Sequence, residues 1–134
     1  MRRVFADTHF YIALLSQRDD AHSAALLWQA NGEIEEVITT SWILVERADA
    51  MNLPSERDIA ARFIARLRSA PKTRVVPVSE DLLWRGFDLY RKRPDKEWSL
   101  TDCISFVVMS DEGLSDALTR DHHFDQAGFT PLLR

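Results

Sequence analysis

The chain has 134 residues, a mass of 15.4 kDa and a formal net charge of −4, with 46% hydrophobic and 28% charged residues. These values are typical of one globular domain that is large enough to bury a hydrophobic core, so we expect a single domain over residues 1–134. The acidic balance argues against a protein that holds nucleic acid by bulk positive charge.

Two features of the sequence bear on the cellular location of the protein. The single cysteine, Cys103, excludes an internal disulfide and lies in an apolar run, where a buried thiol is expected. The apolar runs are far shorter than the roughly 18 residues that a membrane-spanning helix needs. With no signal-peptide pattern either, the sequence predicts a cytoplasmic protein that has no membrane partner.

The first half of the chain alternates short β-branched or apolar runs with helical patterns. A buried strand is predicted at residues 4–6 and a β-branched strand at 37–40. Helices are predicted at 8–16 and 20–30, and a third at 41–51 with Ser41 as its cap.

The second half continues this alternation. A long helix is predicted from residue 54, where Ser55 and Asp58 resemble a capping box. Further on, strands are expected at 73–78, 116–120 and 129–133, and helices from 79, from 99 and from 124.

Strands that alternate with helices predict crossover connections and a mostly parallel sheet with helices on both faces. The expected fold class is therefore a single-domain three-layer α/β/α sandwich. Binding and catalytic sites in such sheets form at the carboxyl ends of the strands.

Four acidic residues interrupt apolar segments of the chain. Asp7 ends the first strand and Asp121 follows the strand at 116–120. Asp102 lies in the first turn of its helix, where the helix dipole favours negative charge. Glu46 lies a turn and a half into the helix that follows the second strand. This pattern predicts that the four side chains meet at one edge of the sheet.

Carboxylates at close range repel one another, and without a cation one or more of them would be held protonated. Mg²⁺ and Mn²⁺ prefer oxygen ligands and would remove this repulsion. Two such ions can activate a water molecule and stabilise the leaving oxygen in a phosphoryl displacement. The sequence does not decide between one ion and two.

Each acid also has a purely structural interpretation. Asp7 is a possible cap of the first helix, and Asp121 is a possible turn residue before the next helix. Asp102 is a possible partner of Ser99 in a capping box. Glu46 is a possible solvated helix residue that pairs with Arg47. Because all four acids are expected at the same edge of the sheet, the interpretation that they act together as a metal site is favoured.

The segments that carry these acids resemble those of PIN domains, and the size of the chain resembles that of VapC-type toxins from bacterial toxin–antitoxin pairs. The resemblance covers nearly the whole chain. It rests on Val4–Thr8, on Thr39–Glu46, on Ser99–Ser105 and on Ala117–Phe124 with Gly128 and Phe129.

The resemblance implies a Mg²⁺- or Mn²⁺-dependent endoribonuclease whose catalytic and metal-binding residues are Asp7, Glu46, Asp102 and Asp121. It also implies supporting roles for the hydroxyls of Thr8 and Thr101, a homodimer, an RNA substrate and a cognate antitoxin protein. His9 departs from the family pattern, in which a small polar residue is frequent at that position. Asp125 is either an accessory acid or a surface residue.

Some cationic and imidazole side chains admit two interpretations. Arg91 and Arg93 belong to a basic cluster that is either a solvated helix end or a contact for RNA phosphates. The histidines, at positions 9, 22, 122 and 123, lack the spacing of a known zinc motif, and hydrogen-bonded or exposed histidines are expected. Apolar residues of the segment 41–70 belong either to the core or to a surface for the antitoxin or a second copy.

Two other functions fit the sequence less well than a ribonuclease does. A non-catalytic PIN-like module that binds RNA or protein is disfavoured, because such a module has no need for four acids. A phosphatase is disfavoured because the segment from Asp7 to His9 lacks the Asp-x-Asp pattern of haloacid-type phosphatases. A receiver domain is disfavoured because no set of an acid pair and a lysine fits one.

Overall fold

The computed structural model describes residues 2–31 and 33–133, so residues 1, 32 and 134 of the predicted domain lie outside the description. The described residues form a five-stranded sheet in the order β3-β2-β1-β4-β5, and each neighbouring pair is parallel. The strands are β1 (Arg2–Ala6), β2 (Ile34–Thr40), β3 (Thr73–Val76), β4 (Asp116–Leu118) and β5 (Thr130–Pro131).

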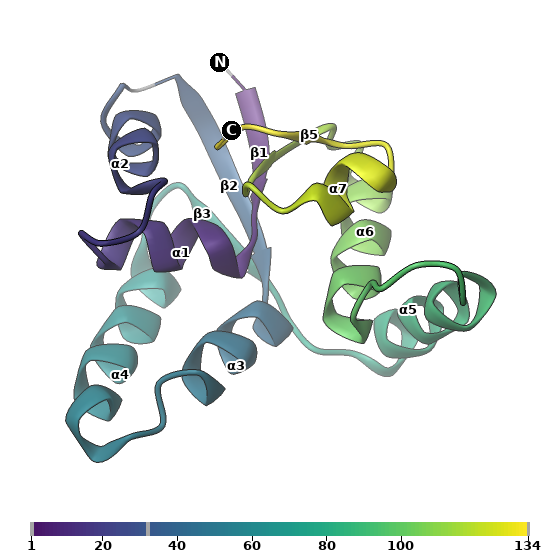
Figure 1. Ribbon diagram of the computed structural model, residues 1–134, viewed down its shortest axis with the longest axis horizontal. Helices are drawn as coiled ribbons and strands as arrows, with labels where there is room; N and C mark the ends of the chain where they lie inside the picture. Colours follow the sequence, from purple (N-terminus) through teal and green to yellow (C-terminus); the bar gives the residue numbers. More distant parts are fainter. Residues whose placement is uncertain (1, 32, 134) are drawn as a thin grey trace.

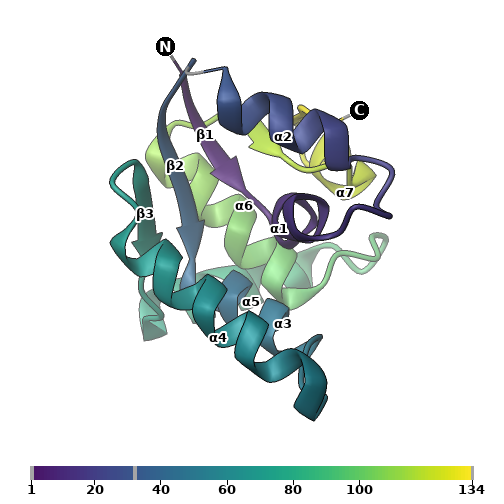
Figure 2. The same ribbon diagram turned by 90° about the vertical axis from the view of Figure 1, so that its left-hand side faces the viewer.

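Helices cover both faces of this sheet. Helices α1, α2 and α4 lie on one side, and α5 and α6 lie on the other (Figure 1). Figure 2 gives the same arrangement from the side, with α4 in front of the strands and α6 behind them. The predicted three-layer α/β/α fold is thus confirmed. The helices are α1 (Thr8–Leu15), α2 (His22–Ala30), α3 (Ser41–Asp49), α4 (Pro54–Ser69), α5 (Glu80–Lys92), α6 (Leu100–Glu112) and α7 (His122–Gln126).

Strand β1 is the centre of the core. Its residues Val4, Phe5 and Ala6 are completely buried, as expected for a parallel strand that has helices on both faces. On one side β1 pairs with β2, and on the other Phe5 and Ala6 pair with Ala117 and Leu118 of β4. The residues that follow β1 and β4 therefore emerge side by side at the carboxyl edge of the sheet.

Two predicted caps at helix starts are wrong. Thr40, and not Ser41, caps α3, because its side chain accepts a 3.2 Å hydrogen bond from the Ile43 amide. Helix α4 begins at Pro54 without a side-chain cap, so the capping box of Ser55 and Asp58 does not form in the described structure. A proline in the first turn has no amide hydrogen that needs a partner, so this helix starts without a cap.

Close packing joins α5 to α6. Gly86 is buried in α5, and a Cβ at this position would collide with the Ile104 side chain and lie 3.1 Å from Ile104 Cα. A glycine is thus required here for the two helices to approach. This contact sets the position of α6 near its first turns.

Charged side chains near the amino half of the sheet form a network with the end of α6. Arg74 donates to both carboxylate oxygens of Glu112, at 3.0 and 2.7 Å, and Arg3 donates to Glu112 at 3.1 Å. Both arginines also pair with Glu36.

Within the described part of the chain, none of the helices is long and apolar enough to span a membrane.

Candidate metal centre

The four acids predicted from the sequence lie at the carboxyl edge of the sheet and the helix starts around it. Asp7 directly follows β1, and Asp121 is the residue before α7, shortly after the neighbouring strand β4. Asp102 lies in the first turn of α6, and Glu46 lies on α3. The interactions below link these residues to one another.

Asp7 is the most deeply buried of the four, with 3% of its surface exposed. Thr119, which is completely buried, donates a 3.0 Å hydrogen bond to Asp7 Oδ2 and accepts one of 3.0 Å from the Asp121 amide. One hydroxyl therefore joins the two neighbouring strand ends. Asp7 precedes α1 but makes no side-chain cap hydrogen bond in the described structure, so the capping interpretation of this residue is not supported.

Burial raises the pKa of Asp7 from its ordinary value of 3.8 to about 6. The main cause is loss of hydration, and the charge of Asp102 raises the pKa further. His9 and the hydrogen bond from Thr119 act in the opposite direction. With this pKa the carboxylate is mostly ionised near neutral pH, at a cost to the folded state that a bound cation would reduce.

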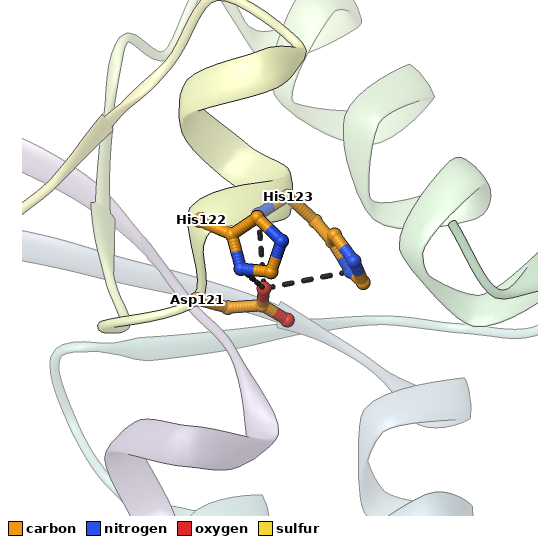
Figure 3. Close-up of side chains that lie close together, drawn as sticks. All are labelled: Asp121, His122 and His123. Atoms are coloured by element: carbon orange, nitrogen blue, oxygen red, sulfur yellow. Dashed lines mark hydrogen bonds and ion pairs between the residues drawn. The ribbon is translucent and has the colours of Figure 1, made fainter. Parts of the chain in front are cut away.

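Asp121 lies among three imidazole rings. Its Oδ1 accepts a 2.9 Å hydrogen bond from the His123 amide and lies 3.4 Å from His123 Nδ1 and 3.7 Å from His122 Nδ1 (Figure 3). Its Oδ2 lies 3.7 Å from His9 Nε2. One oxygen of Asp121, expected as a turn residue before the next helix, thus caps α7, while the other lies toward α1.

Asp102 also has a structural role. It forms a complete capping box with Ser99, in which each residue's side chain bonds to the other's amide, at 3.0 and 3.1 Å. Asp102 Oδ2 lies 3.2 Å from His123 Nδ1 as well. Because His123 contacts both Asp102 and Asp121, its ring connects the start of α6 to the start of α7.

Glu46 is linked to the site through Thr8, the residue after Asp7. The Thr8 hydroxyl donates a 2.5 Å hydrogen bond to Glu46 Oε1. Glu46 is half-buried, and no ion pair joins it to Arg47 among the described residues. Arg47 is itself buried, and its Nε has no hydrogen-bond partner in this part of the chain. The interpretation of Glu46 as a solvated partner of Arg47 is therefore wrong.

The donor set fits a divalent cation. Ligand atoms of Asp7, His9 and Asp121 all lie within 4.8 Å of one another, as do those of Asp121, His122 and His123. Carboxylate oxygens suit Mg²⁺ and Mn²⁺, and a neighbouring imidazole suits Mn²⁺ better than Mg²⁺. The raised pKa of Asp7 supplies the electrostatic reason for a cation at this position.

The remaining predicted site residues are Thr101, Arg91, Arg93 and Asp125. Thr101 lies in the first turn of α6, half-buried, with its carbonyl accepting a hydrogen bond from Ser105, and the role of its hydroxyl stays a prediction. Arg91 pairs with Asp88 at 2.7 Å, and Arg93 forms two 3.0 Å bonds with Asp95. Asp125 is exposed on α7.

Sequence reasoning missed two residues of the site. The sequence pattern places Thr119 only in a strand, although a threonine that ends an apolar run beside an acid is a usable signal for a buried hydroxyl. The four histidines lack a zinc spacing, so the sequence indicates no role for His123 in the site. The structure gathers three of them near Asp121, one from α1 and two from α7, whereas His22 is hydrogen-bonded to the Ala13 carbonyl at 2.6 Å.

Comparison with known proteins agrees with this geometry. The profile of the PIN domain family matches residues 4–130. The chain therefore belongs to the PIN domain family.

Within this family the chain is similar to VapC-type proteins. It is 31% identical over 127 residues to proteins named 23S rRNA-specific endonuclease VapC20 from two strains of Mycobacterium tuberculosis, CDC 1551 / Oshkosh and ATCC 25618 / H37Rv. The alignment covers 94% of this chain and 95% of each relative.

Solved structures give the same result. The crystal structure of M. tuberculosis VapC20, described as a sarcin-ricin loop cleaving toxin, superposes with a TM-score of 0.82 and 30% identity. It covers 95% of this chain and 96% of that one. FitAcB from Neisseria gonorrhoeae superposes with a TM-score of 0.67 over 96% of this chain and 94% of that one, and at 18% identity this likeness concerns the fold alone.

Proposed function

We propose that this protein is a metal-dependent endoribonuclease in which Asp7, Glu46, Asp102 and Asp121 hold Mg²⁺ or Mn²⁺ and are the catalytic residues. The observation that carries the proposal is the buried Asp7 carboxylate, whose pKa is raised to about 6 beside other acids. A buried anion with anionic neighbours needs a positive counter-charge. A divalent cation provides this counter-charge with the fewest additional groups.

The residues around the acids would orient them. Thr119 fixes Asp7 Oδ2, Thr8 fixes Glu46 Oε1, and the capping box fixes Asp102. The bound cation would supply activation of a water molecule and stabilisation of the oxygen that leaves phosphorus. Because these side chains are held before substrate arrives, little reorganisation accompanies the reaction.

The substrate and the biological role follow from the relatives. A relative that shares 31% of its residues over nearly the whole chain is named an endonuclease specific for 23S rRNA, and its crystal structure is described as that of a toxin. We extend the RNA substrate and the toxin role to this chain. A cognate antitoxin and a cytoplasmic location belong to the same proposal.

Partner surfaces have some support in the segment 41–70. Val45, Leu53 and Ile59 are 55%, 60% and 52% exposed, more than core residues would be. Phe63 instead packs edge-on against Tyr11 with ring centroids 5.1 Å apart. The exposed side chains suit a second copy or an antitoxin, and light scattering of the purified protein tests for the proposed homodimer.

The extent of the domain is also a proposal. The family match over residues 4–130 supports one PIN-like domain over residues 1–134. Limited proteolysis should give a resistant fragment of nearly this length. A stable shorter fragment would contradict it.

An RNA cleavage assay tests the activity directly. Purified protein should cut RNA with Mg²⁺ or Mn²⁺ and stop cutting when chelator is added. The Asp7→Asn and Asp102→Asn variants should remain folded and lose cleavage, whereas Asp58→Asn, a charge-matched change at an exposed position on α4, should cleave normally. Metal-independent RNA binding without cleavage would favour the alternative, a non-catalytic PIN-like binding module.

A further inference from the structure

A hollow lies between the end of α5 and the start of α6. Its volume is about 430 Å³, within the range of about 300–1,000 Å³ that is usual for small-ligand pockets. It contains basic, aromatic and thiol side chains in close proximity. The lining residues are Tyr90, Arg91, Arg93, Pro94, Lys96, Glu97, Trp98 and Cys103.

One wall of this hollow is rigid. Trp98 is 6% exposed, donates a 3.0 Å hydrogen bond to Gln126 Oε1 of α7 and packs edge-on against Phe106, with ring centroids 5.1 Å apart. The guanidinium of Arg93 lies 5.1 Å from the Trp98 ring centroid and is bound by both oxygens of Asp95. Arg93 is thus held in place as part of the wall, with its Nε and Nη2 donors directed at Asp95.

The hollow and the adjoining end of α5 carry positive charge that the neighbouring acids only partly balance. Asp88 is shared by Arg91 at 2.7 Å and Lys92 at 2.8 Å, and Asp95 is shared by Arg93 and by Lys96 at 3.8 Å. Four cations therefore face two shared acids and Glu97, in a chain whose net charge is −4. Arg91 binds Asp88 through Nη2, and a guanidinium has five N–H donors, so it retains donors for a phosphate.

An aromatic face completes the hollow. Tyr90 is 48% exposed, although its position on α5 belongs to the helix's apolar stripe. Exposed aromatic rings beside cations are the recurring platform on which proteins stack the bases of single-stranded nucleic acids. A phosphate and a base thus both find partners in one space.

The hollow lies next to the segment of the chain that carries Asp102. Trp98 and Cys103, which line it, flank the segment from Ser99 to Asp102 in the chain, and this segment forms the capping box at the start of α6. The loop between α5 and α6 runs beside this first turn (Figure 1). A strand of RNA with one phosphate at the acids would pass this hollow with a neighbouring nucleotide.

We propose that this hollow binds one nucleotide of single-stranded RNA beside the bond that is cut, with its base on Tyr90 and its phosphate between Arg91 and Lys96. The inference rests on the proposed ribonuclease function and adds to it the place where substrate is held. It also separates the roles of two arginines, since Arg91 contacts substrate and Arg93 supports Trp98.

Binding of a short fluorescent single-stranded RNA to the Asp7→Asn protein tests the stacking contact. The Tyr90→Ala change should weaken this binding by at least about fivefold, the lower end for loss of one stacked base, and Tyr90→Phe should restore it. The matched control is Phe87→Ala, which removes a comparably exposed ring that packs on Trp84 outside the hollow. Equal affinities for the Tyr90→Ala and Phe87→Ala proteins would overturn the proposal.

Salt dependence tests the phosphate contact. Arg91→Ala should reduce the slope of log affinity against log salt concentration by about 0.7, the value for one phosphate contact of a single strand. The control is Arg62→Ala on α4, because Arg62 is likewise exposed and paired with an aspartate one turn away. Identical slopes for the two variants would remove Arg91 from the site.

Cleavage kinetics separate the failure of this proposal from the failure of the proposed function. In the otherwise unaltered protein, Tyr90→Ala should raise KM with little change in kcat and should leave stabilisation by Mn²⁺ unchanged. Normal KM in this variant, with active parent protein, would refute the nucleotide site and leave the ribonuclease intact. An inactive parent protein would refute the ribonuclease, and the RNA-binding measurements would then still decide on the hollow.

Discussion

Replacement of Asp7 by asparagine is expected to stabilise the protein when no divalent cation is present. The pKa of Asp7 is about 6 in the folded protein against an ordinary 3.8. At about 1.4 kcal/mol per pH unit, ionising this buried group therefore costs the folded state about 3 kcal/mol at neutral pH. Asparagine keeps an oxygen that can accept the hydrogen bond from Thr119 and carries no charge.

The pH dependence gives the sign of the effect. The folded protein holds a proton on Asp7 more tightly than the unfolded chain does, so the penalty is absent below about pH 4, grows up to about pH 6 and is complete above it. In chelator near pH 8 the Asp7→Asn protein should be more stable by up to about 3 kcal/mol, an increase in Tm on the order of 5–10 °C. Near pH 4 the two proteins should unfold at nearly the same temperature.

Thermal unfolding in chelator across this pH range is the assay, with Asp58→Asn on the surface of α4 as the control. That control should change stability by less than about 0.5 kcal/mol at every pH. Saturating Mn²⁺ should reverse the order, because the cation stabilises only the protein that binds it. An Asp7→Asn protein that is no more stable than its parent near pH 8 would refute the argument that burial destabilises this carboxylate.

Three further changes test one contact at the site and two elsewhere in the fold. Thr119→Val should lower the free energy of unfolding by about 1–3 kcal/mol and weaken Mn²⁺ binding, because the buried Asp7 loses its hydrogen-bond donor. An unchanged denaturation midpoint would contradict this. Gly86→Ala should lower the free energy of unfolding by about 1–3 kcal/mol in denaturant unfolding, because the new methyl group overlaps with Ile104. An unchanged free energy of unfolding would mean that α5 and α6 separate easily. Glu112→Gln should cost about 1 kcal/mol at low ionic strength and less in high salt, since its two arginine partners are partly exposed; a loss that is independent of salt would argue against charge as the cause.

The order of strands and helices could be predicted from the sequence because each element has its own pattern. The run Val4 to Ala6 is apolar throughout, as a strand buried on both faces requires, and the predicted bounds of most elements lie within three residues of those observed. Helix starts were less predictable where neighbouring residues have equal capping chemistry. Thr40 caps α3 because its pairing with Val76 keeps its backbone extended, and this long-range contact has no local signal.

The candidate site was predictable as a set of acids but not as a network. Asp7 and Asp121 follow strands, so their meeting follows from the parallel sheet alone. The contact of His123 with both Asp102 and Asp121 depends on how α7 packs beside α6, which depends on many residues far apart in the chain. Periodicity identifies the buried face of a helix, but it does not identify which polar atom of a loop meets another.

The double use of Asp102 and Asp121 affects how mutagenesis of this protein has to be interpreted. Each carboxylate accepts a backbone amide hydrogen bond at the start of a helix, so an alanine at either position frays α6 or α7 as well as removing a negative charge. An inactive alanine variant would then report two defects at once. Asparagine keeps the amide acceptor and separates them, and Ser99→Ala, which frays α6 while leaving all four acids in place, measures the contribution of the helix end alone.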